Sequence, residues 1–296
     1  MAIPVPLLFF SGFSRFGSAA APVALVAIAL CGCSINLGSL SPSAEREEPA
    51  RLTSPSNIAS LTEAIRNNPS DPQAYNMRGS VLAQAGRTED ALADFNKAVS
   101  LDPNYGQAFA NRGLIYRRTG RLDQAMADYN RALALDAGYA PAYLGRGLVY
   151  KAQKQDAEAL EDFNKAISLH PDNAEARYNR GLLYQAEKQH QLAIDDFTAA
   201  SSLMPQQAEP LLARALSYLA LDRAKEAAAD LDEAVQADPQ KEQIWITRGL
   251  AYERLGDKTK AAGSYARAIN LRPRDETARN GFARVGGKTG QTYATF

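Results

Sequence analysis

Arginine recurs every 34 residues through the middle of this sequence, and an aspartate follows most of these arginines 16 positions later. The arginines are Arg78, Arg112, Arg146, Arg180, Arg214 and Arg248. The residues 16 positions on are Asp94, Asp128, Asp162, Asp196, Asp230 and Ser264. A guanidinium and a carboxylate form strong charge-assisted hydrogen bonds, and here the two positions recur together. We therefore predict five structural Arg–Asp pairs; the alternative is a basic stripe that binds an acidic partner.

Three features could indicate catalysis or cofactor binding, but the residues around each of them argue against that interpretation. The segment GGKT at 286–289 has Phe282 where a phosphate-binding loop requires its first glycine, and it follows a predicted helix rather than a strand. His170 and His190 lie in predicted turns without a Glu or Cys partner at metal-binding spacing. Paired acidic residues recur on predicted helix faces that contact solvent. We predict no enzymatic activity and no cofactor, metal or small-molecule substrate.

The charge balance and the cysteines exclude two further possibilities. The chain has 33 lysines and arginines and 33 aspartates and glutamates, so no net positive field attracts nucleic acid. The two cysteines, Cys31 and Cys33, both lie near the N-terminus. We therefore expect no nucleic-acid partner, no disulfide in the fold and no cysteine-based metal site.

The arginines belong to a longer repeat. The unit at 72–105 recurs at 106–139, 140–173, 174–207, 208–241 and 242–275. Within each unit, apolar and small residues recur at spacings of three and four, which places them on one face of each of two helices. In the first unit the small residue is Gly79 and the large one Phe95; Gly86 between them suits a left-handed helix end, and Pro103 stops the second helix. Each unit is predicted to be a helix hairpin, and such hairpins must stack to bury their apolar stripes.

At these positions the sequence resembles the tetratricopeptide repeat (TPR) family over residues 72–275, departing from the family pattern at Arg177 and Ala137. The resemblance implies an all-α fold: a right-handed TPR α-solenoid of six helix-hairpin repeats with capping helices at both ends. Residues 57–71 match the second half of a unit and are predicted to cap the N-terminal end. Residues 276–285 resemble the helix that covers the last repeat, and residues 286–296 are expected to form a loose tail.

The resemblance also implies that the first helix of each unit lines a concave, partner-binding face. The inward positions of that face hold mostly apolar side chains here, with a polar rim beside them. The predicted groove residues are Leu114, Arg117, Leu144, Leu148, Lys151, Tyr178, Leu182, Gln185, Leu212, Leu216, Ile246 and Leu250. Such a stripe favours an apolar or amphipathic partner segment; the alternative is that its leucines only pack between units. The family's carboxylate clamp, which grips acidic C-termini with Lys and Asn, is missing.

Residues 1–32 resemble a lipoprotein signal peptide. The apolar run at 19–30 has the length of a signal h-region, and the segment ending in Cys33 resembles the bacterial lipobox, although Cys31 is unusual at its place. The resemblance implies cleavage before Cys33 and lipidation of Cys33. Residues 33–56 are rich in Ser and Pro and are expected to form a flexible tether. An uncleaved anchor helix and a plain secretory signal are the alternatives.

Together these features favour a lipid-anchored, non-enzymatic scaffold or adaptor in the bacterial cell envelope. Ser34 after the cysteine favours an outer-membrane lipoprotein that faces the periplasm. The expected partners are other proteins or peptides, with the membrane contacted through the lipid. Within this class the chain also resembles lipoproteins that assemble secretins or pili, and adaptors that recruit processing proteases or peptidoglycan and glycosyl-transfer enzymes.

Overall fold

The computed structural model describes residues 54–288 and Tyr293, and this part of the chain is α-helical without a strand. The helices are α2 (Pro55–Asn67), α3 (Pro72–Gln84), α4 (Thr88–Leu101), α5 (Gly106–Arg118), α6 (Leu122–Leu135), α7 (Ala140–Ala152), α8 (Asp156–Leu169), α9 (Ala174–Ala186), α10 (His190–Leu203), α11 (Ala208–Ala220), α12 (Ala224–Ala237), α13 (Glu242–Arg254), α14 (Lys258–Leu271) and α15 (Glu276–Arg284). The prediction of an all-α fold is confirmed for this part of the chain.

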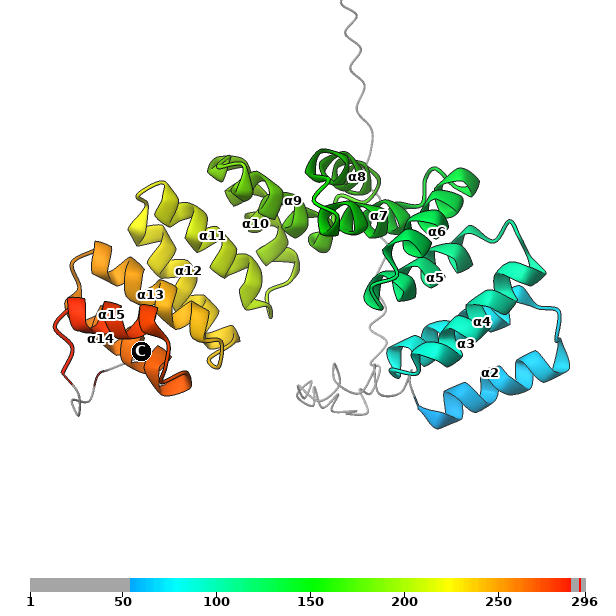
Figure 1. Ribbon diagram of the computed structural model, residues 1–296, viewed down its shortest axis with the longest axis horizontal. Coiled ribbons are helices and arrows are strands. Elements are labelled where there is room, and N and C mark those ends of the chain that lie inside the picture. Colours follow the sequence, from blue (N-terminus) through cyan, green and yellow to red (C-terminus); the bar gives the residue numbers. More distant parts are fainter. Residues whose placement is uncertain (1–53, 289–292, 294–296) are drawn as a thin grey trace, which may run out of the picture. The chain divides into compact units, whose positions relative to one another are not determined.

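Consecutive helices pair into antiparallel hairpins that follow one another in chain order (Figure 1). Each odd-numbered helix from α3 to α13 packs against the even-numbered helix after it. These pairs make the most extensive helix–helix contacts in the described part of the molecule. Successive odd-numbered helices also contact one another, from α3 to α15. The odd-numbered helices α3 to α13 therefore form a continuous layer, whose surface we call the first-helix face.

In every hairpin except that of α11 and α12, an aromatic ring packs directly on the backbone of a glycine. A Cβ atom added to Gly181 would lie 2.7 Å from Cε1 of Phe197, and Phe197 is fully buried. The same contact joins Gly79 to Phe95. In the hairpin of α11 and α12, Ala215 and Leu231 take these two places. A larger residue on one helix is thus matched by a smaller one on the other, because interiors are close-packed.

The turn inside each hairpin closes with a left-handed residue. The N–H of Arg87 donates to the carbonyl of Leu82 at 2.9 Å, and Gly86 between them has a φ of +74°. This is the Schellman arrangement, as predicted for Gly86. At the equivalent place three units carry non-glycine residues with positive φ, namely Lys154, Lys188 and Asp222. L-residues pay a steric penalty in this conformation, so these turns are less favourable than those with glycine.

A single helix covers each end of the array. At the N-terminal end α2 packs on α3, and Ser54 caps α2 by accepting a hydrogen bond from the N–H of Asn57. At the C-terminal end α15 packs on α13 and α14, and Asp275 caps α15 in the same way. Val285 is buried and Phe282 packs against the last core cluster. These helices shield apolar faces that would otherwise contact water.

Several predicted segments fall outside the described residues. They are residues 1–32, the lipidation site Cys33, most of the 33–56 tether and most of the 286–296 tail. Within the described residues, none of the helices combines the length and hydrophobicity needed to cross a membrane.

Candidate partner-binding surface

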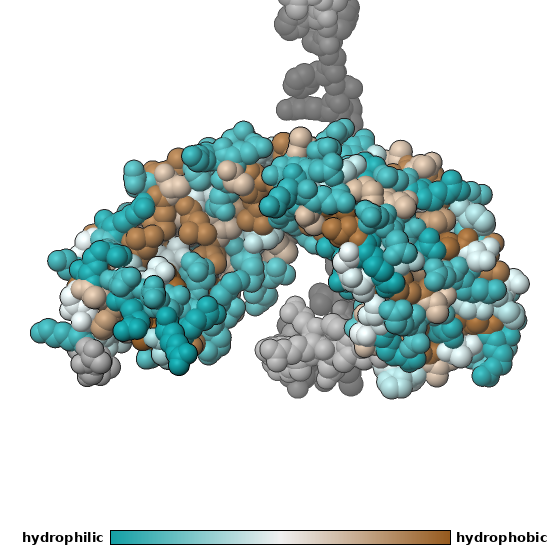
Figure 2. All heavy atoms as spheres, in the orientation of Figure 1, coloured by the Kyte–Doolittle hydropathy of each residue, from teal (hydrophilic) through white to brown (hydrophobic). Residues whose placement is uncertain are grey.

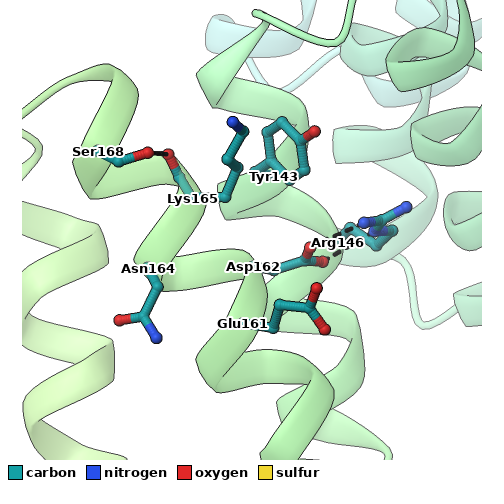
Figure 3. Close-up of a pocket in the computed structure, with 7 residues that line it drawn as sticks. All are labelled: Tyr143, Arg146, Glu161, Asp162, Asn164, Lys165 and Ser168. Carbon is teal, nitrogen blue, oxygen red and sulfur yellow. Dashed lines mark hydrogen bonds and ion pairs between the residues drawn. The ribbon is translucent and has the colours of Figure 1, made fainter.

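All five predicted Arg–Asp pairs form, and each is bidentate. Figure 3 shows Arg146 of α7 reaching Asp162 of α8; its Nε donates to one carboxylate oxygen and its Nη2 to the other, both at 2.8 Å. The equivalent pairs are Arg78–Asp94, Arg112–Asp128, Arg180–Asp196 and Arg214–Asp230. The hydrogen bonds that Arg146 donates to Asp162 raise the pKa of Arg146, and burial opposes this effect. Each of these five guanidinium groups is paired with a carboxylate, so the arginines are not available as the basic stripe that was the alternative.

A third contact of each arginine was missed by the sequence reasoning. The Nη1 of Arg146 donates to Oδ1 of Asn130 on α6, in the preceding hairpin, at 2.8 Å. The equivalent acceptors lie 16 residues before each arginine and are Thr62, Asn96, Asn164 and Thr198. The signal was present, because Asn96, Asn130 and Asn164 recur at the repeat spacing. Each arginine thus joins the two helices of its own hairpin to the preceding helix of the array, which for Arg78 is α2.

The last repeat rearranges the same contacts. Arg248 donates through Nη1 to the hydroxyl of Ser264 at 2.8 Å and through Nε to Asp232 of α12 at 2.7 Å. The hydroxyl of Tyr252 also donates to Asp232, at 2.6 Å. Burial and then this bond raise the pKa of Tyr252 to about 12. In this repeat the carboxylate partner of the arginine is Asp232 of the preceding hairpin, so Arg248 still pairs with one carboxylate.

Around the Arg146–Asp162 pair lies an open cavity of about 590 Å³ (Figure 3). Its lining includes Tyr143, Asn164 and Lys165, and the Arg146 guanidinium lies 5.6 Å from the Tyr143 ring centroid. The two central charges neutralise each other. This cavity is therefore the solvated edge of a structural ion pair rather than a binding site.

The predicted groove residues fall into two groups on the first-helix face. Partly exposed members are Leu114, Leu144, Leu148, Tyr178, Leu182 and Leu250, and Leu216 is 39% exposed. Leu212 and Ile246 are only 8% exposed each and offer little surface to a partner. In the space-filling view hydrophobic side chains gather over α11 amid a largely polar surface (Figure 2). The exposed apolar surface of this face is therefore carried mainly by leucines of α5, α7, α9, α11 and α13.

The predicted polar rim mostly joins neighbouring first helices. Lys151 donates to Oδ1 of Asn179 at 2.8 Å. Gln185 donates to the carbonyl of Ala213 and to the hydroxyl of Ser217, both at 2.8 Å. Desolvation lowers the pKa of Lys151. Lys151 and Gln185 therefore form hydrogen bonds within the array.

Arg117 differs from the other rim residues. It lines a pocket of about 200 Å³ between α5 and α7, together with Leu114, Leu144, Leu148 and Tyr129. Among the described residues, neither the buried Nε of Arg117 nor the buried hydroxyl of Tyr129 has a hydrogen-bond partner. A buried polar group left without a partner costs about 1–3 kcal/mol. Sequence reasoning named Arg117 but missed Tyr129, which stands at a core position.

In the described part of the chain, no cluster of three or more His, Cys, Asp or Glu side chains is placed to hold a metal ion.

Family models place most of this region in one class of repeat. A model described as "TPR repeat" matches residues 113–154 and 147–188. Models described as "Tetratricopeptide repeat" match residues 58–106, 212–276, 95–127 and 174–207. A search of curated protein sequences returned no match.

Solved structures share the fold at low sequence identity. The Cut9–Hcn1 hetero-tetramer of the APC/C matches with a TM-score of 0.66 and 17% identity, over 82% of this chain and 47% of that one; the chain thus spans about half the length of that relative. PilW, described as a widely conserved type IV pilus biogenesis factor, matches at 0.62 and 17%, over 71% and 97%. YrrB, described as a TPR protein with an unusual peptide-binding site, matches at 0.50 and 24%, over 62% and 95%.

Proposed function

Because the chain belongs to the tetratricopeptide repeat family, we propose that it is a non-enzymatic interaction scaffold that binds a segment of a partner protein along its first-helix face. The observation that carries the proposal is the row of partly exposed leucines on consecutive first helices. Leu148, Leu182 and Leu216 stand at the same repeat position on α7, α9 and α11, helices that contact one another in order. A partner segment can therefore meet them in sequence.

The energetics favour an apolar or amphipathic partner. Burying apolar surface contributes about 25 cal/mol per Å², and contiguous apolar patches on a soluble protein often mark interaction sites. The repeat arginines of the first helices are already paired with aspartates of the second helices, so these arginines are a poor source of affinity for a partner. The first-helix face is the surface that offers apolar contact in regular steps.

A second candidate within the same class is assembly of a pilus or secretin. The observation that favours it is the likeness to PilW, which extends over 71% of this chain. Recruitment of cell-envelope enzymes, such as processing proteases or peptidoglycan and glycosyl-transfer enzymes, is a further version of the adaptor role. The peptide-binding description of YrrB supports the shared element of these versions, which is capture of a polypeptide segment.

We also propose that the scaffold is held in the bacterial cell envelope by a lipid on Cys33. The support is the sequence of residues 1–33, where an apolar run precedes the lipobox-like segment. Ser34 favours the outer membrane, with the array facing the periplasm. Acyl labelling that depends on Cys33 is the test of this part.

The binding proposal is tested by site-specific photocrosslinking in cells, followed by mass spectrometry of the captured proteins. A crosslinker at Leu182 is expected to capture a defined partner. Leu216→Glu should reduce that capture at least tenfold, because burying a leucine side chain contributes about 1.5–3 kcal/mol. Leu203→Glu is the matched control, since Leu203 is 43% exposed at the end of α10, outside the first-helix layer. Equal losses in the two variants would contradict the proposal.

A further inference from the structure

Tyr129 reaches the pocket between α5 and α7 because Gly145 has no side chain. A Cβ atom at Gly145 would lie 2.3–2.6 Å from ring atoms and the hydroxyl of Tyr129. The ring of Tyr129, which is 2% exposed, therefore extends from α6 through the gap left by Gly145 until its hydroxyl lines the pocket on the first-helix face. Burial raises the pKa of this hydroxyl, and the charge and hydrogen-bonding capacity of the nearby Arg117 guanidinium oppose that shift. A phenol hydroxyl can donate a hydrogen bond.

The same tyrosine–glycine pair occurs four repeats later, and there it holds a carboxylate. Tyr265 packs on Gly281, whose added Cβ would lie 2.5 Å from the ring. The Tyr265 hydroxyl donates to Oε2 of Glu253 at 2.8 Å, and Nη2 of Arg284 donates to the same oxygen at 2.8 Å. A carboxylate thus lies between a tyrosine hydroxyl and a guanidinium.

The first copy keeps the tyrosine donor of that arrangement, has Leu148 at the position of Arg284, and has a guanidinium in place of the acceptor. Arg117 stands at the repeat position of Glu253, twelve residues before the tyrosine, and a guanidinium cannot accept a hydrogen bond. Among the described residues, the Tyr129 hydroxyl and Arg117 Nε are both left without a partner. Two arginines, Arg117 and Arg118, line this pocket against one carboxylate, that of Glu175. The local charge therefore favours an incoming anion.

We infer that this pocket accepts one carboxylate from the bound partner, an Asp or Glu side chain that takes hydrogen bonds from Tyr129 and Arg117. Apolar residues beside that acid would contact Leu114, Leu144 and Leu148, which line the same pocket. The volume of about 200 Å³ is below the 300–1,000 Å³ of typical small-molecule sites and suits a single side chain. The inference rests on the proposed function and names an anchor point within it. A C-terminal carboxylate shares this chemistry and is distinguished by experiment.

The experiment begins with random twelve-residue peptides, displayed without a free C-terminus and selected on the immobilised full chain. Enriched peptides should share an acidic residue flanked by Leu, Ile, Val, Phe or Met. Three versions of the consensus peptide are then synthesised. Two have an amidated C-terminus and carry either Glu or Gln at the acidic position. The third is shortened so that its free C-terminal carboxylate lies where the Glu carboxylate would be. Binding is measured by fluorescence anisotropy. The Glu peptide should bind at least tenfold more tightly than the other two.

Protein variants assign the preference to the pocket. Tyr129→Phe and Arg117→Gln should weaken binding of the Glu peptide five- to twentyfold and leave the Gln peptide nearly unchanged. Arg117→Glu should abolish the preference, because it supplies the internal carboxylate that Glu253 supplies to Tyr265. Tyr265→Phe is the matched control and should keep the preference. Circular dichroism melting verifies that each variant is folded.

The possible failures separate the two proposals. If peptides bind but show no acidic position, or if the variants weaken Glu and Gln peptides equally, the pocket assignment is wrong and the scaffold function stands. If the shortened form binds as tightly as the Glu form, the source is a chain terminus and the side-chain assignment is wrong. If no peptide is enriched, the proposed function fails and the pocket assignment fails with it.

Discussion

Arg146 shows, at the scale of a single residue, why one side chain type recurs in every repeat. Its guanidinium contacts Asp162 on α8 and Asn130 on α6, while its own backbone lies on α7. The rings of Tyr143 and Tyr150 flank it, with centroids at 5.6 and 5.8 Å. Arginine alone among the cations offers several donors in a fixed planar fork. A lysine at this place would form one of these contacts and lose the others.

This geometry gives a double-mutant prediction. Arg146→Leu should lower the free energy of unfolding by about 3 kcal/mol, because the Asp162 carboxylate stays buried without its partner; the Asp162 side chain is 4% exposed. Arg146→Leu combined with Asp162→Leu should cost clearly less, since no charge is then buried. Urea unfolding followed by circular dichroism measures both. Lys165→Leu, an exposed site on α8, is the control; equal losses in the single and double variants would argue against pairing.

The residue-scale predictions succeeded where both partners lie in one repeat. A spacing of 16 between Arg146 and Asp162 suffices, because the hairpin brings those positions together. Tyr129 could not be singled out in the same way, since Phe or Tyr fills that core position in most repeats. Its role depends on Gly145 in the next repeat and on the absence of an acceptor at Arg117, which only the packed structure reveals.

At the scale of the helix hairpin, the match of small and large residues sets the distance between the two backbones. Gly181 allows the ring of Phe197 to touch the backbone of α9. The hairpin of α11 and α12 reaches the same end with Ala215 and Leu231, both fully buried. One hairpin combines glycine with phenylalanine, and the other combines alanine with leucine. Both pairs fill the space between the two helices of their hairpin.

We therefore predict compensation between these two positions. Gly181→Ala should lower the free energy of unfolding by about 1–3 kcal/mol through overpacking, and Phe197→Leu should lower it by a similar amount through a cavity. The double variant reproduces the natural Ala215–Leu231 pair and should lose clearly less than the two single losses combined. Thermal and urea unfolding provide the measurement. Strict additivity would show that the two side chains do not share one space.

Hairpin formation was predictable from the spacing of apolar residues and from Gly86, whose left-handed conformation is confirmed. The equivalent turn residues Lys154, Lys188 and Asp222 gave no such signal on their own, because each is an ordinary exposed polar residue. Their positive φ follows from their place in the repeat. The packing of the neighbouring helices overrides local preference there.

At the scale of the whole molecule, a solenoid couples each repeat mainly to its neighbours, so the proposed binding surface extends over several repeats. We propose that a lipid on Cys33 sets the location of the array. The described helices begin at residue 55; if the segment before them is the tether predicted from its composition, its roughly 20 residues would reach on the order of 25 Å from a bilayer. The first-helix face could then meet partners near the membrane surface without itself entering the lipid.

The two cysteines allow this proposal to be tested with a matched pair of variants. Wild-type protein produced in a diderm bacterium with an alkyne fatty acid should become labelled and fractionate with membranes. Cys33→Ala should abolish the label, because the thiol that accepts the lipid is gone, and should release the protein from membranes or leave it with an uncleaved signal. Cys31→Ala should remain labelled, since Leu30 occupies the place before Cys31 where a small residue is required. Labelling that persists in Cys33→Ala, or that is lost in Cys31→Ala, would contradict the proposal of a lipid on Cys33. Binding at the first-helix face would then have no link to a membrane.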